Sequence, residues 1–209
     1  KLLSETRRQE IMKAKFYKDR CLRLAGDLLI RLALQENGDV SDYHYIIKTE
    51  AGRPYIASSS LDFNVAHTDG LVAVAIGQCK LGLDAEKIEP AADLMDLAGK
   101  YFTASEYSWL SKLDSQKQVE CFYKIWTAKE SVIKAVGSGF SIAPDTFSVV
   151  TAGEDRLAST VSLAGQTWRL LPLPDTAGCK ITLCADTPFE FTIREVNPDA
   201  FAKNIKKLR

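Results

Sequence analysis

The amino-acid sequence predicts an α+β fold in which two similar halves, each a helix packed on a small antiparallel sheet, form a pseudo-dimer. A helix, a glycine-containing turn and a hairpin follow one another in the first half, as LAGDLLIR, AGRP and VAHTDGLVAVAI. The same order recurs in the second half, as WTAKESVIK, GSGF and LPDTAGCKITLCA. The length of 209 residues suits two small, closely joined halves or one compact unit.

The boundary between the halves is expected near Gly77 to Lys80, where the first pattern ends. We therefore predict an N-terminal half at 1–79 and a C-terminal half at 80–209. A cleft between two such halves is a usual position for a ligand site.

In the first half, helical periodicity runs from about Ser4 to Leu34, with leucines on one face and arginines on the other. The NGD sequence at 37–39 ends this pattern. EAGRPYI indicates a turn that leads into a strand. The clearest hairpin is FNVAHTDGLVAVAIG, which predicts a strand to His67, a turn at Thr68–Gly70 and a second strand.

In the second half, KLGLDAEKI predicts a strand, and Thr103 with Glu106 has the spacing of a capping box that starts a short helix. A longer helix is expected from about Val119 to Val136, ended by the glycines of GSGFSI. The sequence NPDAFAKNIKKLR at the end indicates a surface helix or tail. Further strands are predicted around 147–150, 158–163, 167–171 and 180–185.

The composition limits the classes of partner. Hydrophobic residues make up 46% and charged residues 26% of the chain, which is typical of a soluble protein with a sizeable core. Basic and acidic residues are equal at 27 each, so we expect no nucleic-acid partner. No apolar run approaches the length of a membrane span, and nothing at the start is typical of a signal peptide. The five cysteines include no pair with two-residue spacing, which indicates reduced thiols and a cytoplasmic location.

The GLDAEK segment places two carboxylates on one side of a strand. Asp84 and Glu86 are two residues apart, so their side chains face the same way. Adjacent carboxylates repel unless one takes up a proton or a cation lies between them. A hard cation such as Mg²⁺ prefers these oxygens and completes its shell with water and phosphate. A solvent-facing polar edge beside Lys87 explains the same residues, and the segment alone does not decide.

The helix FYKIWTAKESVIKAV carries charges beside its apolar stripe. Glu130 and Lys134 lie one turn apart, the spacing of an ordinary surface pair worth roughly a few tenths of a kcal/mol. Lys129 falls in the middle of the apolar face, where a charge needs a buried partner or an escape along its stem. The functional interpretation is that Glu130 joins Asp84 and Glu86 around a metal, while Lys134 reaches an anion.

Two further cations suit phosphate recognition. His67 lies at the predicted hairpin tip, and Arg53 in GRP carries the fork-shaped guanidinium that matches phosphate. His67 is also explained as a hydrogen-bonded turn residue, and Arg53 is also explained as a solvated loop residue. His44 has nothing around it in the sequence that indicates a role. The sequence contains no Ser-His-acid signature, P-loop or GxGxxG motif.

Taken in order, GRP, FNVAH, GLDAEK and FYKIWTAKESVIKAVGSGFSI resemble the 4'-phosphopantetheinyl transferase superfamily, surfactin-synthetase-activating (Sfp) type. Members carry G-K/R-P, F-N-x-S-H, G-x-D-x-E and W-x-x-K-E-S-x-x-K in this order. The resemblance runs from about Lys15 to Val150, and more loosely to Ala185. The length fits the pseudo-dimeric type of the family, so the resemblance implies a monomer with its active site in the cleft.

The resemblance implies transfer of the phosphopantetheine arm of coenzyme A to a serine of an apo acyl or peptidyl carrier protein, with release of adenosine 3',5'-bisphosphate. It implies that Asp84, Glu86 and Glu130 hold Mg²⁺, or Mn²⁺, against the coenzyme A diphosphate. Lys134 would contact this diphosphate, so that Glu130 and Lys134 are the catalytic residues. Whether Glu130 or a water on the metal takes the serine proton stays open.

The resemblance also assigns the nucleotide end of coenzyme A. His67 and Arg53 would bind it, most directly at its 3'-phosphate. The backbone of Asn64, Val65, Ala66 and His67 would line the adenosine pocket. Alanine stands at position 66 where the family usually has serine, which removes one side-chain hydrogen bond, and the family's extra N-terminal strand is absent. Four basic residues near the start rank below Arg53 as phosphate contacts: Arg7, Arg8, Lys13 and Lys15.

The segment from Ile88 to Trp109 corresponds to the family's docking region for the carrier protein. Its hydrophobic and basic side chains either pack a helix or, where exposed, contact the carrier. Zero net charge means that electrostatic steering would be local. The candidate docking residues are Leu94, Met95, Leu97, Lys100, Tyr101 and Phe102.

Two other functions compete with the transferase. One is a metal-dependent diphosphate hydrolase that acts on coenzyme A or nucleotides without a carrier. The other is a catalytically silent homologue that binds coenzyme A or a carrier protein. The presence of Asp84, Glu86, Glu130 and Lys134 argues against the silent homologue. For Lys129, the hypothesis is a buried carboxylate partner or a role in orienting the ligand.

Overall fold

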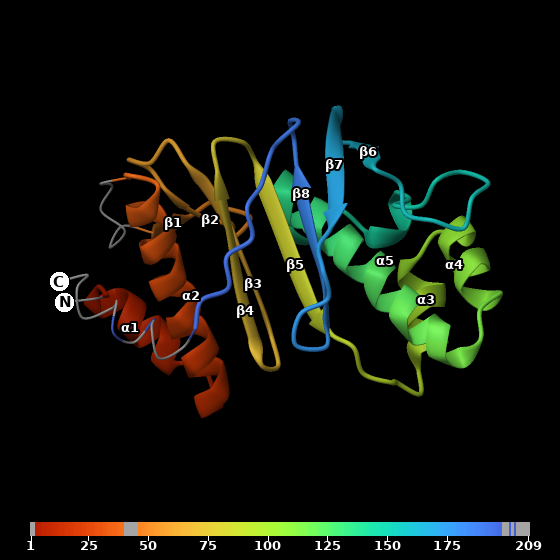
Figure 1. Ribbon diagram of the computed structural model, residues 1–209, viewed down its shortest axis with the longest axis horizontal. Coiled ribbons are helices and arrows are strands. Elements are labelled where there is room, and N and C mark those ends of the chain that lie inside the picture. The colour runs from red at the N-terminus through yellow and green to blue at the C-terminus, as the bar shows by residue number, and fades with distance from the viewer. Residues whose placement is uncertain (1–2, 40–45, 198–200, 202, 204–209) are drawn as a thin grey trace.

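The structure, a computed structural model, describes residues 3–39 and 46–197, with 201 and 203 (Figure 1). The mixed helix and antiparallel sheet content confirms the predicted α+β class. The helices are α1 (Glu5–Met12), α2 (Tyr17–Glu36), α3 (Leu94–Tyr101), α4 (Ala104–Ser111) and α5 (Ser115–Val136). The strands are β1 (Ile46–Lys48), β2 (Pro54–Ile56), β3 (Asp62–Thr68), β4 (Leu71–Gly77), β5 (Leu81–Lys87), β6 (Thr160–Leu163), β7 (Gln166–Pro172) and β8 (Cys179–Ala185). Short 3-10 turns occur at η2 (Gly139–Ser141) and η3 (Pro144–Thr146).

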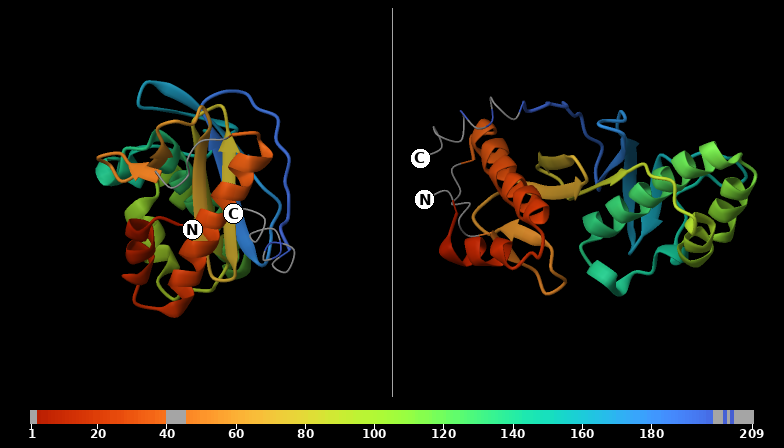
Figure 2. Two further views of the ribbon diagram at one scale, coloured as in Figure 1. Left: turned by 90° about the vertical axis from the view of Figure 1, so that its left-hand side faces the viewer. Right: turned by 90° about the horizontal axis from the view of Figure 1, so that it is seen from below.

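The strands form two hairpins and one larger sheet. β1 pairs with β2, β3 pairs with β4, and four strands follow the order β5-β8-β7-β6, all antiparallel. Helix α2 packs on the β3–β4 hairpin, whereas α5 packs on β5 and β8 (Figure 2). These two helix-on-sheet units lie next to each other along the long axis of the molecule. The arrangement is compatible with a pseudo-dimer, and the division at 79/80 stays a prediction.

The apolar cores follow from these packings. Phe63 of β3 is fully buried with Ile30 and Leu34 of α2. Ile125 and Val132 of α5 are fully buried in the largest cluster, which extends to α3, α4 and β7. Since side chains three and four residues apart share a helix face, these residues bury one stripe of each helix.

The predicted hairpin and capping box are confirmed. Thr68 pairs with Leu71 around the turn, and Thr103 and Glu106 exchange the side-chain to backbone bonds of a capping box at the start of α4. The helix at 115–136 begins four residues earlier than predicted, because the Asp114 side chain caps it by accepting from Lys117 N at 3.0 Å. Its end at Val136 and left-handed Gly137 agree with the prediction.

Two predicted elements are wrong in part. The helix predicted from Ser4 to Leu34 is broken between α1 and α2, where Phe16 is extended and Arg20 Nε donates to the carbonyl oxygen of Ala14 at 2.8 Å. The strand predicted at 147–150 is replaced by an irregular segment with an isolated bridge at Val150. The N–H of Val149 is bound by a carboxylate rather than by a neighbouring strand.

The segment 186–197 has no regular secondary structure and returns from β8 across the β3–β4 hairpin towards α2 (Figure 1). Phe189 packs beside the cluster that contains Ala66 and Leu81, and Arg194 forms an ion pair with Glu36. The predicted helix or tail that follows lies almost wholly outside the described residues, as does His44. None of the helices that the structure describes has both the length and the apolar character to cross a membrane.

Candidate functional site

The site is built on β5, which lies directly against α5. A Cβ atom at Gly82 would lie 1.9 Å from the carbonyl oxygen of Ser131 and 2.5 Å from Ala135 N. Only glycine therefore allows this strand to approach the helix so closely. The close approach brings the carboxylate of Asp84, two residues further along the strand, towards the polar edge of α5.

That edge of α5 carries Glu130 and Lys134, both half-buried. Lys134 Nζ lies 2.6 Å from Asp84 Oδ1 and 3.2 Å from the carbonyl oxygen of Leu83. Lys134 therefore does not pair along the helix with Glu130 as an ordinary surface residue would. It reaches across to a carboxylate that is 5% exposed.

Burial and mutual repulsion shape the electrostatics of the three carboxylates. Burial raises the pKa of Asp84, and the Lys134 ammonium opposes this effect only in part. Burial, followed by the charge of Asp84, raises the pKa of Glu86 to about 7. The same two causes raise the pKa of Glu130. Each of the three therefore sits where additional positive charge would stabilise its ionised form.

The carboxylates have the chemistry of a site for a hard divalent cation. Asp84 Oδ2 is buried and has no hydrogen-bond partner among the described residues, which is unusual for a buried oxygen. Within the described ranges, however, no three His, Cys, Asp or Glu side chains form a group placed to hold a metal ion. The donor set thus matches Mg²⁺ in its oxygens and its charge, but the described side chains are not grouped around one position.

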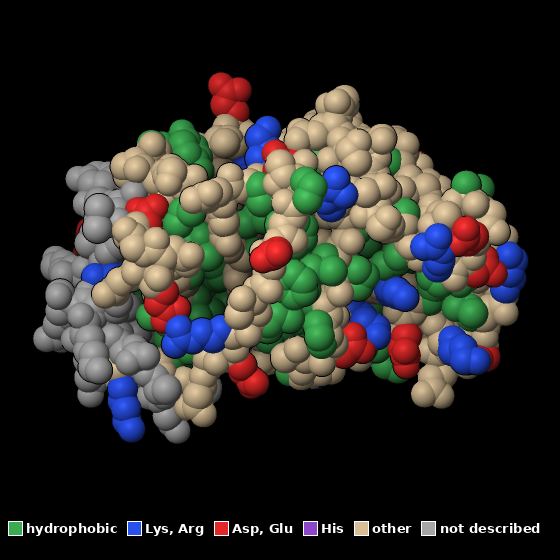
Figure 3. All heavy atoms as spheres, turned by 45° about the horizontal axis from the view of Figure 1, so that its top comes forward, with side chains coloured by type: hydrophobic (Ala, Val, Ile, Leu, Met, Phe, Trp, Pro, Cys, Tyr) green, Lys and Arg blue, Asp and Glu red, His purple; other side chains and the backbone are tan. Residues whose placement is uncertain are grey.

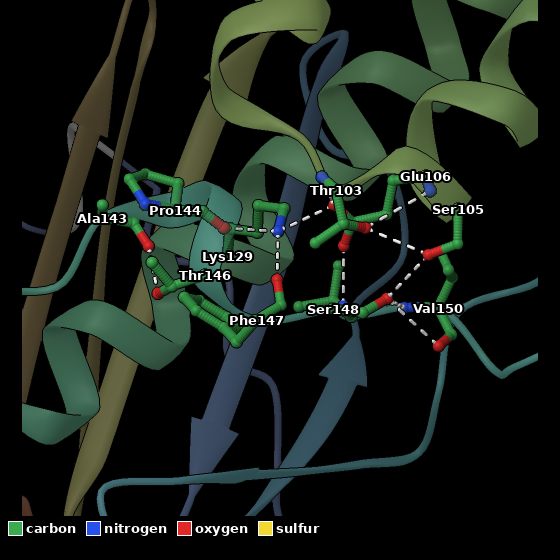
Figure 4. A network of polar contacts seen from close by, with 11 residues as sticks. Thr103, Ser105, Glu106, Lys129, Ala143, Pro144, Thr146, Phe147, Ser148 and Val150 are labelled. Carbon is green, nitrogen blue, oxygen red and sulfur yellow. Dashed lines mark hydrogen bonds and ion pairs between the residues drawn. The ribbon is translucent and has the colours of Figure 1, made fainter.

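Lys129, one residue before Glu130, belongs to a separate network whose two charged members are fully buried (Figure 4). Its side chain is 1% exposed, and Nζ lies 2.8 Å from Oε2 of Glu106, which is 0% exposed. Nζ also donates to the carbonyl oxygens of Pro144 at 2.7 Å and Phe147 at 2.6 Å. The hypothesis of a buried carboxylate partner for Lys129 is confirmed.

Glu106 is satisfied on both of its oxygens. Oε1 accepts from Val149 N at 2.7 Å, and Oε2 accepts from Thr103 N at 2.8 Å in addition to Lys129. The network therefore joins α5, the start of α4 and the segment after η3 (Figure 4). The network holds the part of α5 around Lys129 against these elements, whereas Glu130 and Lys134 face the site.

Strand β3 meets β5 through side chains that accept hydrogen bonds from backbone N–H groups. The pairs are Asp62 with Leu81 at 2.8 Å, Asn64 with Leu83 at 3.0 Å, and Thr68 with Lys87 at 3.2 Å. The acceptors lie on alternate residues of β3, as expected for one face of a strand. Ala66 occupies the same face and has no side-chain acceptor to offer.

The four residues predicted to line an adenosine pocket therefore point in different directions. Asn64 and Ala66 are buried towards β5, and Val65 packs against Gly26 of α2. His67 is exposed near the end of β3. Of these four residues, only His67 is exposed, and the pocket role of this backbone stays a prediction.

Arg53 precedes β2 and its side chain is 13% exposed. The guanidinium contacts the carboxylate of Asp62 and the carbonyl oxygens of Leu81, Lys134 and Ala135. All of these partners are groups of the protein itself. The contact of Arg53 with phosphate stays a prediction.

The basic residues near the start differ in their availability. Arg7 forms two hydrogen bonds with the buried Asp27, at 2.7 and 2.9 Å, and a third with Glu10. Arg8 lies 3.6 Å from Glu5. Lys13 and Lys15 are exposed. Arg7 thus joins α1 to α2, and the lysines are better placed to meet an anion.

The candidate docking residues on α3 fall into two groups. Leu94 and Phe102 are buried in the main core, so packing explains them and they offer little surface to a partner. Met95, Leu97 and Tyr101 are partly exposed, and Lys100 lies 4.9 Å from the Tyr101 ring centroid. Figure 3 shows acidic and basic side chains gathered at this end of the molecule, beyond a central apolar area. Docking stays a prediction for the exposed members.

The sequence did not reveal three residues that support the elements around the site. Glu106 was recognised only as a capping residue, although it also neutralises Lys129. Asp62 and Thr68 were not singled out, although they share the alternate spacing of Asn64 and Ala66. That spacing was the available signal, because alternate residues of a strand face the same neighbour.

Comparison with known proteins identifies the family of the chain. A family model described as the 4'-phosphopantetheinyl transferase superfamily matches residues 80–184. A second, described as 4'-phosphopantetheinyl transferase, N-terminal, matches residues 1–79.

Curated relatives point the same way. The chain is 36% identical over 129 residues to a 4'-phosphopantetheinyl transferase of Bacillus subtilis, covering 60% of this chain and 56% of the relative. It is 32% identical over 146 residues to 4'-phosphopantetheinyl transferase gsp of Aneurinibacillus migulanus, covering 69% and 60%. It is 29% identical over 189 residues to 4'-phosphopantetheinyl transferase Sfp of Bacillus subtilis strain 168, covering 89% and 83%. The chain thus spans about three fifths of the first two relatives. It belongs to the 4'-phosphopantetheinyl transferase superfamily.

Proposed function

We propose that the protein transfers the 4'-phosphopantetheine arm of coenzyme A to a serine hydroxyl of an apo acyl or peptidyl carrier protein, releasing adenosine 3',5'-bisphosphate. The observation that carries the proposal is the contact between β5 and α5, where Lys134 Nζ lies 2.6 Å from Asp84 Oδ1. Burial raises the pKa values of Glu86 and Glu130, and both residues are close enough to Asp84 for its charge to raise these values further. Carboxylates and an ammonium in one half-buried place suit a diphosphate with its divalent cation.

In this proposal Asp84, Glu86 and Glu130 hold Mg²⁺, or Mn²⁺. The ion, when bound, neutralises diphosphate charge and stabilises the leaving group. Lys134 leaves Asp84 and contacts the diphosphate oxygens, where it stabilises the negative charge that develops as the phosphorus–oxygen bond to the nucleotide breaks. The serine oxygen forms the new bond to phosphorus. Glu130, half-buried on the edge of α5 that carries Lys134, is one candidate to accept the serine proton.

The nucleotide end of coenzyme A is proposed to lie by the β3 backbone at 64–67. The exposed His67 imidazole would contact the 3'-phosphate. The partly exposed α3 residues Met95, Leu97 and Tyr101 are proposed to contact the carrier protein. We also propose a monomer, supported by a site whose Asp84 and Lys134 come from one chain, and a cytoplasmic location, supported by the five free cysteines.

The test is a mass spectrum of apo carrier proteins after incubation with this protein, coenzyme A and Mg²⁺. A panel of acyl and peptidyl carriers should be run in parallel, with Glu130→Gln as the matched control. We expect a mass gain equal to one phosphopantetheine on at least one carrier, and no gain in the control.

The same reactions distinguish the competing functions. Cleavage of coenzyme A without any carrier would identify a diphosphate hydrolase. Coenzyme A binding without turnover on any carrier would indicate a silent homologue. Either result would overturn the transferase proposal.

A further inference from the structure

The last turn of α5 receives hydrogen bonds from outside the helix. The final carbonyl groups of any helix have no intrahelical partner. Gly137 N donates to the carbonyl oxygen of Ile133 at 3.0 Å. Arg53 Nη1 donates to the next two carbonyl oxygens, those of Lys134 and of Ala135, the latter at 3.3 Å. An arginine from the other helix-on-sheet unit therefore caps α5.

The backbone around this cap is shaped to admit the arginine. Gly137 has φ 74°, and a Cβ atom there would lie 3.0 Å from Arg53 Cδ. Gly139 has φ 59°, and a Cβ atom there would lie 3.0 Å from the carbonyl oxygen of Ala51. Glycine therefore satisfies both the left-handed conformation and the close packing. The AGRP and GSG turns fit directly against each other.

The other end of the guanidinium binds the starts of β3 and β5. Nη2 forms an ion pair with Asp62 and donates to the carbonyl oxygen of Leu81 at 2.8 Å. Asp62 Oδ2 in turn accepts from Leu81 N at 2.8 Å. The positive charge thus lies between a carboxylate and the negative end of the α5 dipole, both of which stabilise it.

We propose that Arg53 is a positioning residue that fixes the last turn of α5, and thereby holds Lys134 in register with Asp84. The Lys134 carbonyl accepts from Arg53, while the Lys134 ammonium contacts Asp84. Two N–H groups of Nη1 and two of Nη2 have protein acceptors, out of five on an arginine. A phosphate contact would have to displace part of this set. The catalytic consequence rests on the proposed transferase function.

The experiment compares coenzyme A with dephospho-coenzyme A, which lacks the 3'-phosphate, as substrates for wild type, Arg53→Met and His67→Ala. For Arg53→Met we expect kcat to fall by about tenfold or more on both substrates, because small misplacement of a catalytic group can lower rates up to about 10²-fold. The ratio of kcat/KM for the two substrates should stay at the wild-type value. For His67→Ala, the proposed phosphate contact, the ratio should fall towards one.

Two matched variants keep the test decisive if Arg53→Met folds poorly. Arg53→Lys keeps the charge but cannot fork between Asp62 and the helix carbonyls, so it should restore kcat only in part. Asp62→Asn keeps an acceptor for Leu81 N while removing the charge partner of Arg53. Asp62→Asn should therefore also lower kcat, although Asp62 is not a proposed contact of the 3'-phosphate.

Hydrogen exchange of the amides in the last turn of α5 gives a readout that does not depend on transfer activity. We expect faster exchange at 133–139 in Arg53→Met and Asp62→Asn than in wild type, with the rest of α5 unchanged. If wild type shows no transfer, the proposed function fails and the exchange result still tests the cap. A substrate ratio that falls in Arg53→Met, with unchanged exchange, would overturn the positioning role and assign Arg53 to the phosphate.

Discussion

Helix α5 carries two lysines that each meet a buried carboxylate, and the two pairs differ in how completely they are satisfied. Lys129 has three acceptors for its three N–H groups, and both oxygens of Glu106 are bonded. Lys134 is 32% exposed and meets one carboxylate oxygen and one carbonyl. The second oxygen of Asp84 is buried without a hydrogen-bond partner in the part of the chain that the structure describes.

We call Lys129 with Glu106 the closed pair and Lys134 with Asp84 the open pair. The difference between them indicates which buried charge stabilises the fold and which can bind a ligand. A closed network leaves no donor or acceptor for an incoming molecule, so the Lys129 pair is structural. An incomplete network beside two further carboxylates has charge and acceptors left over, which is typical of a functional site. Changes to each pair should therefore affect different observables.

Removing the closed pair should have the largest effect, and on stability. Lys129→Met leaves the Glu106 carboxylate buried without its cation, and such half-pairs typically lower the free energy of unfolding by about 3–5 kcal/mol. Chemical denaturation of wild type and variant measures the loss. A variant that kept both wild-type stability and turnover would contradict the structural role.

The control for this prediction is the double variant Lys129→Met with Glu106→Gln. Removing both charges should recover part of the lost stability, because no uncompensated buried charge is left. If the double variant lost as much as the sum of the two single variants, the lysine and the carboxylate would not be coupled.

Removing a carboxylate charge from the open pair, at Asp84, or from Glu130 beside it, should act on activity instead. Asp84→Asn and Glu130→Gln should each lower kcat/KM for transfer by at least about 100-fold, the scale of losing one electrostatic stabiliser of a transition state. Their midpoints of denaturation should not fall, because burial already disfavours both charges and the charge of Asp84 adds to this at Glu130. A stability loss as large as that of Lys129→Met would erase the distinction between the pairs.

Divalent cation should stabilise the protein through Asp84 and the two carboxylates beside it, and not through the Lys129 pair. In the presence of coenzyme A, free Mg²⁺ at about ten times its Kd should raise the free energy of unfolding by about 1.4 kcal/mol. Thermal unfolding with Mg²⁺ and with a chelator measures this, and Asp84→Asn should abolish the shift. A shift that persisted in Asp84→Asn would place the cation elsewhere.

The smallest expected effect concerns the junction of β3 and β5. Ala66→Ser places a hydroxyl on the face where Asp62, Asn64 and Thr68 accept from β5. One added hydrogen bond should raise the free energy of unfolding by about 1 kcal/mol. Val65→Thr, on the opposite face, is the control and should give no gain. A loss in Ala66→Ser would mean that this buried position is too tightly packed for the hydroxyl.

Local chemistry was readable from the sequence. The Asp69-Gly70 turn, the Thr103 and Glu106 capping box and the glycine end of α5 each depend on residues within a few positions. These elements are decided by short-range hydrogen bonds and backbone preference. The structure accordingly contains all three.

Partners distant in sequence were not readable. The position of Lys129 in an apolar stripe indicated that a buried partner was needed, but Glu106 was already explained by its capping role. The Arg53 cap on α5 joins residues more than 80 positions apart. The irregular segment at 147–150 has apolar residues typical of a strand, yet Glu106 takes the N–H that a neighbouring strand would need. Such outcomes depend on which tertiary partner the folded chain brings close, and local periodicity does not encode that partner.

The return of 186–197 across the β3–β4 hairpin has a consequence for how the two helix-on-sheet units stay together. The chain leaves the α2 unit once at 78–80, and after β8 it reaches back to Glu36 through Arg194. If the units were separate polypeptides, this segment would be an arm that extends from one subunit and binds the surface of the other. Within one chain, the arm is presented at high effective concentration. Opening the two units would therefore require releasing this arm as well as bending at 78–80.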